Sequence, residues 1–167
     1  TPEKEIPFAG HPTIGTAFAV NKSRNKTFLT QECGIGIVTI KIKDGVYQFS
    51  CPKAKVLATG LNSHHLLIPA LEGCYDTSSS CSSSPYLYSE VDSVADCCAK
   101  SLGSLPPALV EGGRKWWIVE LKQETSLRQW NPNFEAIANL AKSTGSMGIC
   151  AFVRTGDQTM VIRAFAC

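Results

Sequence analysis

The chain has 167 residues and a mass of 18.0 kDa, which is enough for one domain or two small ones. Its hydrophobic content of 44% is ordinary for a globular protein, and its net charge of +2 argues against a nucleic-acid or membrane-surface partner. No apolar run reaches membrane-spanning length. The chain starts with Thr1 rather than Met, so we expect its natural start to lie upstream.

The first part of the chain predicts one helix followed by strands. We expect the helix over about residues 12–21, because Pro12 suits the first helical position. Apolar residues follow on nearly every face of this helix, which is typical of a buried helix. Strands are then expected at residues 26–31, 33–42 and 46–51, the last two joined by a turn at Lys43-Asp44-Gly45. These are local antiparallel pairings beside a buried helix.

The middle of the chain has weaker signals. Residues 56–71 predict a short helix, although Pro69 lies within it. Residues 73–84 are rich in Ser and Cys and have no periodicity, which is typical of a surface loop. A further helix is expected from Ser89 or Asp92 to about Leu102.

The last part of the chain returns to strands around one helix. Strands are expected at residues 107–111, 115–121, 147–154 and 158–165, with a helix at 132–142. Trp116 and Trp117 adjoin in a strand, so they should face opposite sides. Strands and helices in both halves indicate an α+β protein. We expect two domains, residues 1–88, which include the loop at 73–84, and residues 89–167.

The eight cysteines favour a reduced, cytoplasmic protein. Most lie inside apolar patterns, no CxxC motif is present, and the histidines are not at metal-ligand spacing. We therefore expect no metal, with Cys74 and Cys81 as the most exposed thiols. A cysteine-rich metal or redox protein stays an alternative, which thiol titration and metal analysis would identify. The eight are Cys33, Cys51, Cys74, Cys81, Cys97, Cys98, Cys150 and Cys167.

The segment around Gly10 and His11 is the strongest candidate site. Gly10 suits a turn or a close backbone approach, and the helix after it presents its positive end, which favours anions. His11 stands at that end, and histidine exchanges protons near neutral pH. The pattern indicates a place that holds a carboxylate and moves a proton; a purely structural, hydrogen-bonding His11 is the alternative.

Residues 7–17, Pro-Phe-Ala-Gly-His-Pro-Thr-Ile-Gly-Thr-Ala, closely resemble the signature of the PhzF family, the phenazine-biosynthesis-like isomerases. The resemblance continues in order at residues 31–42, 116–121, 131–137 and 161–166. It implies an α+β, diaminopimelate epimerase-like fold. In that fold two similar domains each wrap a sheet around a central helix, and the active site lies in the cleft between them.

The resemblance also implies a function. The family members are isomerases or epimerases without cofactors, and they move a proton on a small carboxylic acid. By this resemblance His11 is the catalytic candidate, while Gly10, His11, Thr13 and Ile14 are the substrate-binding candidates, with the amides of Thr13 and Ile14 binding a carboxylate. It further implies a biosynthetic, cytoplasmic homodimer that binds neither nucleic acid nor membrane.

Two parts of the family pattern have no match in these residues. The family's acid/base Glu stands in a Ser-Glu-Thr-like stretch upstream of the motif, and an acidic pair with a TGSA-like helix start follows the last strand. Residues 144–146 read Thr-Gly-Ser but lack the preceding acidic residue. We therefore expect the N-terminal and C-terminal parts to be missing. A catalytically incomplete fragment or a non-catalytic binding protein is the alternative to an enzyme. A cysteine racemase is disfavoured, because the helix start offers no Cys.

Overall fold

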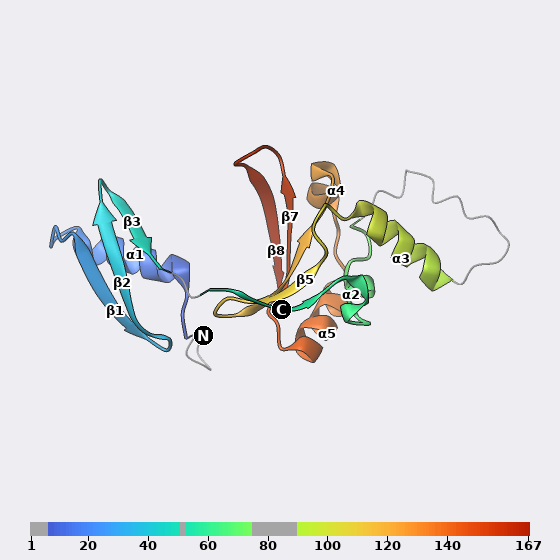
Figure 1. The fold of residues 1–167 in the computed structure, drawn as a ribbon, viewed down its shortest axis with the longest axis horizontal. Helices are drawn as coiled ribbons and strands as arrows, with labels where there is room; N and C mark the ends of the chain where they lie inside the picture. Colours follow the sequence, from blue (N-terminus) through green and yellow to red (C-terminus); the bar gives the residue numbers. More distant parts are fainter. Residues whose placement is uncertain (1–6, 51–52, 75–89) are drawn as a thin grey trace. The chain divides into compact units, whose positions relative to one another are not determined.

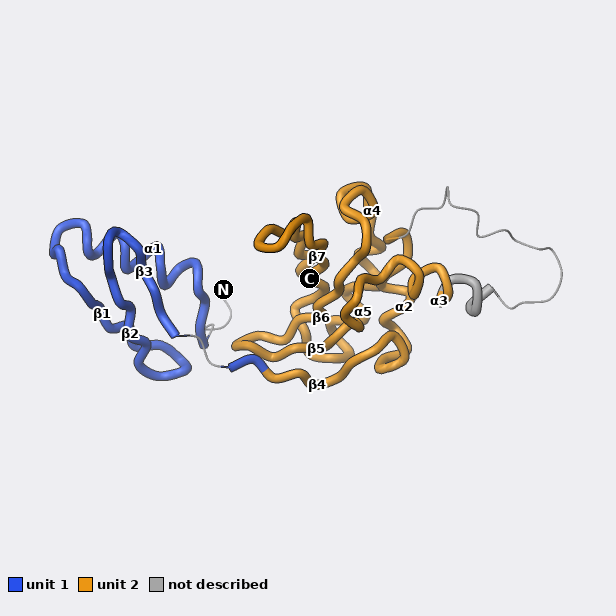
Figure 2. The backbone as a smooth tube through the Cα atoms, turned by 45° about the horizontal axis from the view of Figure 1, so that its top comes forward, with its two compact units in different colours: residues 1–54 blue, residues 55–167 orange. Residues whose placement is uncertain are grey.

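The structure is a computed structural model that describes residues 7–50, 53–74 and 90–167, with side chains from residue 95 in the last range (Figure 1). The chain divides into two compact units, residues 1–54 and residues 55–167 (Figure 2). Both contain helices and sheets, so the α+β prediction is confirmed.

The first unit consists of helix α1 (Gly10–Asn21) and strands β1 (Phe28–Cys33), β2 (Gly36–Lys43) and β3 (Val46–Phe49). The strands form an antiparallel sheet in the order β1-β2-β3. Asp44 and Gly45 have φ of 50° and 78°, the left-handed values that a tight type I′ hairpin requires, so the predicted turn is confirmed. Helix α1 contacts β3, where Phe18 and Tyr47 meet edge to face with ring centroids 5.8 Å apart.

Helix α1 is less buried than the sequence predicts. Its buried side chains are Thr13, Ala17 and Asn21, which form a single stripe at four-residue spacing. Phe18 is 57% exposed, although it lies in the same helix. The expectation of a helix buried on most faces is therefore wrong within the described residues, because only one stripe of α1 is covered.

The second unit is built on a five-stranded sheet in the order β4-β5-β6-β7-β8. Neighbouring strands are antiparallel, except that β6 and β7 are parallel. A parallel pair needs a crossover connection, and helices α4 and α5 supply it. The strands are β4 (Lys55–Thr59), β5 (Ala108–Glu111), β6 (Lys115–Glu120), β7 (Gly148–Arg154) and β8 (Met160–Ala166).

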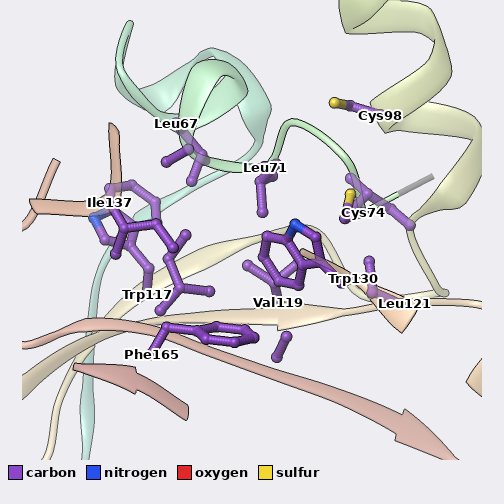
Figure 3. Close-up of a cluster of buried hydrophobic side chains, with 14 of the residues drawn as sticks. Leu67, Leu71, Cys74, Cys98, Trp117, Val119, Leu121, Trp130, Ile137 and Phe165 are labelled. Atoms are coloured by element: carbon purple, nitrogen blue, oxygen red, sulfur yellow. The ribbon is translucent and has the colours of Figure 1, made fainter. Parts of the chain in front are cut away.

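One face of this sheet carries the hydrophobic core of the second unit. Trp117 and Val119 of β6 and Phe165 of β8 lie in one cluster with Ile137, from a helix, and with Leu71, which directly follows another (Figure 3). Trp117 is fully buried while Trp116 is only half-buried, so the prediction that they face opposite sides is confirmed. The helical elements of this unit are η1 (Leu61–Ser63), α2 (Leu67–Ala70), α3 (Glu90–Ser101), α4 (Glu124–Gln129) and α5 (Phe134–Thr144).

The region predicted as a helix at 56–71 is different in the structure. It begins with strand β4 and continues through η1 into the short helix α2. Strand β4 pairs with β5, which is distant in sequence, and this tertiary pairing outweighs the local helical pattern. The two compact units of the structure meet at residues 54 and 55, whereas the predicted domains, residues 1–88 and 89–167, stay a prediction. Most of the predicted loop at 73–84 lies outside the described residues.

Candidate functional site

Helix α1 begins without a side-chain cap. Ala9, just before it, is extended at φ −143° and ψ 119°, and the first turn contains no acidic residue. The first backbone hydrogen bond runs from the Thr13 N–H to the Ala9 carbonyl oxygen at 3.2 Å. The amides of Gly10 and His11 precede that bond and have no partner within the helix, and Pro12 has no N–H. The positive end of α1 is therefore open to an anion.

Two glycines let the segment before α1 lie close to the sheet. A Cβ on Gly10 would stand 3.4 Å from Cζ of Phe49, whose ring also meets Phe8 at a centroid distance of 5.3 Å. A Cβ on Gly34, in the β1–β2 turn, would lie 2.7 Å from the Pro7 Cα, which is a clash. Gly34 therefore anchors the segment that positions His11. The sequence analysis missed it, because this contact is distant in the chain.

The predicted site residues differ in exposure. His11 is exposed, whereas Gly10 and Ile14 are half-buried. Thr13 is only 2% exposed, and its Oγ1 is a buried oxygen without a hydrogen-bond partner among the described residues. Because the Thr13 amide already bonds to Ala9, the open amides are those of Gly10 and His11. Thr13 lies on the covered stripe of α1, so its hydroxyl is closed to solvent, unlike the exposed His11.

A hollow of about 910 Å³ lies within the first unit. It is lined by Ile14 of α1 and by residues of β2 and β3, including Phe49, which also contacts the Gly10 position. Its lining mixes aliphatic and aromatic residues with polar ones and with the cationic Lys41. The helix start thus adjoins a hollow of the size and mixed chemistry that small-molecule sites have.

A second polar cluster surrounds Glu120 at the end of β6. The carboxylate is only 6% exposed and accepts hydrogen bonds from the Leu105 N–H at 2.8 Å and from Ser104 Oγ at 3.1 Å. Arg154 Nε lies 3.1 Å from it. Burial raises the pKa of this carboxyl, but these hydrogen bonds and Arg154 together hold it below its ordinary value. A carboxylate kept ionised in this way suits a structural role better than proton transfer.

Arg163 and His64 also have structural roles, because their side chains form hydrogen bonds with other described residues of the second unit. Arg163 Nη1 donates to the carbonyl oxygens of Leu127 at 2.7 Å and Trp130 at 2.8 Å. His64 Nδ1 accepts from the Leu66 N–H, so Nε2 carries the proton and donates toward Ser143 Oγ at 3.3 Å. This histidine therefore cannot activate the serine as a base.

The cysteines differ from expectation in two respects. Cys74, predicted to be exposed, is fully buried, and Cys81 lies outside the described residues. Cys97 is disulfide-bonded, so the thiols are not all reduced in this structure. Within the described ranges, no three His, Cys, Asp or Glu side chains are placed to hold a metal ion. No helix in that part of the chain is long and apolar enough to cross a membrane.

Solved structures place the chain in the epimerase-like α+β class. A protein described as a predicted epimerase from Pseudomonas aeruginosa matches with a TM-score of 0.59 at 17% identity, over 93% of this chain and 48% of its own. A PhzF-family protein from Bacillus anthracis matches with a TM-score of 0.58 at 21% identity, over 99% of this chain and 51% of its own. A PhzC/PhzF protein from Clostridium difficile matches with a TM-score of 0.58 at 16% identity, over 99% of this chain and 50% of its own.

The family follows from the sequence. The family model described as PhzC-PhzF, phenazine biosynthesis-like protein, matches residues 1–167, so the chain belongs to that family. A curated relative, "Antisense-enhancing sequence 1" of Schizosaccharomyces pombe, is 30% identical over 175 residues, which cover 99% of this chain and 51% of the relative. The chain therefore spans about half the length of the relatives it matches.

Proposed function

We propose that the protein is an isomerase or epimerase that moves a proton on a small carboxylic acid without a metal or organic cofactor. Membership of the PhzC-PhzF family and the epimerase-like fold support the reaction class. The observation that carries the proposal is the uncapped start of α1, where open amides and the exposed His11 lie within one turn of helix.

Each group has a part in this proposal. The amides of Gly10 and His11 bind the substrate carboxylate, since the helix dipole favours an anion there. The His11 imidazole donates or accepts a proton at an oxygen or amine of the substrate. A carboxylate acid/base, which the family carries upstream of this motif, completes the reaction in the whole protein.

Hydrogen–deuterium exchange tests the proposal. The whole protein is incubated in deuterium oxide with a panel of 2-amino and 2-hydroxy acids, and deuterium at the acidic C–H position is measured by mass spectrometry. We expect incorporation with at least one acid, and a loss of roughly 100-fold or more in His11→Asn. His65→Asn is the matched control, because His65 is an exposed histidine of the other unit.

The alternative is a binding protein that keeps the helix-end site but lacks catalysis. It requires only the open end of α1, whose described first turn contains no acidic residue. Binding is followed by NMR at the amides of Gly10 and His11 during titration with the same acids. Binding without deuterium incorporation supports the alternative, and the absence of both overturns the proposed site.

The proposal also includes a homodimer in the cytoplasm. Sedimentation tests the dimer, and cell fractionation tests the location.

A further inference from the structure

His64 joins three elements of the second unit. It is half-buried and lies in the connection between strand β4 and helix α2. Its Nδ1 accepts a hydrogen bond from the Leu66 N–H at 3.2 Å, and its Nε2 lies 3.3 Å from Ser143 Oγ in the last turn of α5. Its ring also meets the ring of Trp117, on β6, edge to face with centroids 6.4 Å apart. One side chain therefore links the start of α2 to α5 and to the sheet.

These contacts fit the neutral form of the His64 ring. An Nδ1 that accepts from an amide carries no proton, so the proton of the neutral ring is on Nε2. Ser143 Oγ can accept that proton, because its own hydroxyl donates to the Leu140 carbonyl oxygen at 2.9 Å. In the cation both ring nitrogens carry protons. The Nδ1 proton would then face the Leu66 N–H, and two donors cannot form a hydrogen bond with each other.

The surroundings of His64 supply no carboxylate to compensate a positive charge. Its ring stacks on that of His65, with centroids 4.7 Å apart and an interplanar angle of 21°, so charges on both rings would repel. In the described parts of the chain neither ring forms an ion pair, and η1 and α2 contain no charged residue. The carbonyl end of α5 attracts a cation, but Lys142 in that turn opposes one. At the start of β6, Lys115 stands opposite Glu111 of β5, so these charges offset each other.

Helix α2 is short, lies beside α5 and contributes to the core (Figures 1 and 2). It spans Leu67–Ala70, and both of these end residues are fully buried. The Leu67 N–H donates to the His64 carbonyl oxygen at 3.0 Å, and the Ala70 N–H donates to the Leu66 carbonyl oxygen at 3.2 Å. A helix of this length has little stability of its own and depends on such contacts. The bond to Nδ1 of His64 thus acts on the residues that place α2 in the core.

We propose that His64 is a pH-sensitive switch that holds the start of α2 in place at neutral pH and releases it in mild acid. This inference does not rest on the proposed isomerase function. The neutral ring accepts the Leu66 N–H and the protonated ring cannot. The stabilisation is therefore present while the ring is neutral and is lost as the pH falls and the ring takes up a proton. Histidine is the side chain whose charge changes in this range.

NMR of the whole wild-type protein tests the proposal without any variant. Nitrogen chemical shifts of the His64 ring should show an unprotonated Nδ1 and a protonated Nε2 at neutral pH. Between about pH 7.5 and about pH 5.5, the protection factors of the Leu66 and Ala70 amides should fall roughly 5–10-fold, as expected for the loss of one hydrogen bond. The buried Val119 amide of β6 is the internal reference, and its protection should change by less than about twofold.

Two substitutions separate His64 from its stacked neighbour. His64→Gln has an amide oxygen that can accept from the Leu66 N–H, but it does not titrate, so the pH response of α2 should disappear. On acidification the melting temperature of wild type should fall by roughly 3–6 °C more than that of His64→Gln. His65→Gln is the matched control, because it leaves the bond between His64 and Leu66 intact and should keep most of the response.

Three results would overturn the proposal. The first is a wild-type His64 with a protonated Nδ1 at neutral pH. The second is protection of Leu66 and Ala70 that does not change with pH in wild type. Neither of these depends on a variant being folded. The third is a pH response of α2 that survives in His64→Gln or that is lost in His65→Gln alone.

Discussion

The two units differ in how completely their apolar residues are buried. In the second unit, Leu67, Trp117 and Ile137 are fully buried between sheet and helices. In the first unit, Phe28 is 63% and Ile37 is 75% exposed, and the buried apolar residues of its described part are Ala17, Val38 and Ile40. Because buried apolar area supplies most of the folding free energy, we expect the second unit to be the more stable part. The candidate site lies on the weakly buried first unit.

The largest effect should come from the core of the second unit. Trp117→Ala removes a fully buried indole and should lower the free energy of unfolding by about 3–5 kcal/mol. Urea denaturation followed by circular dichroism measures it. Phe28→Ala, the exposed aromatic of the first unit, is the control and should change stability by less than about 0.5 kcal/mol. Equal effects of the two substitutions would remove the contrast between the units.

A smaller effect is expected at Glu120, where the second unit buries a charge. Glu120→Gln should cost roughly 1–3 kcal/mol at neutral pH, because the Leu105 amide and the Arg154 guanidinium lose a charged acceptor. The folded pKa is depressed, so this stability is present above the ordinary carboxyl pKa of about 4.3 and is lost as the pH falls through the folded pKa. The difference between wild type and variant should therefore shrink in acid.

Denaturation midpoints at several pH values measure this difference. Glu124→Gln is the matched control, because Glu124 forms an exposed ion pair with Arg128 at 2.7 Å. Its effect should stay below about 1 kcal/mol at every pH. A pH-independent difference at Glu120 would contradict the role assigned to its charge.

An effect on stability of similar size, but one that reaches the candidate site, is expected at Gly34. Gly34→Ala places a Cβ against the Pro7 backbone and should cost about 1–3 kcal/mol within the weakly buried first unit. The same substitution should change the chemical shifts of the Gly10 and His11 amides. Gly15→Ala is the control, since a Cβ there meets nothing within 4 Å, and it should stabilise α1 by about 0.5–1 kcal/mol. If the chemical shifts of the Gly10 and His11 amides stay unchanged in Gly34→Ala, Gly34 does not position the candidate site.

Local patterns predicted the first unit better than the start of the second. The hairpin at Asp44 and Gly45 depends on residues that adopt positive φ, and helix α1 begins near Pro12 as its sequence indicates. Strand β4 was missed because its partner β5 lies far along the chain. At the candidate site, His11 was proposed from a motif, and its role stays a prediction. The pairing of Gly34 with Pro7 and the unpaired Thr13 hydroxyl were not found, since both depend on tertiary contacts.

The parallel pairing of β6 with β7 also has a consequence for the order of folding. These strands cannot pair until the chain has passed through α4 and α5, and β4 must likewise wait for β5. The strands of the first unit are joined by short hairpins, so their pairings are local and form without long loop closure. The unit that carries the candidate site should thus collapse early, while the more stable unit folds slowly. During synthesis, the helix that presents His11 would be in place before the sheet of the second unit closes.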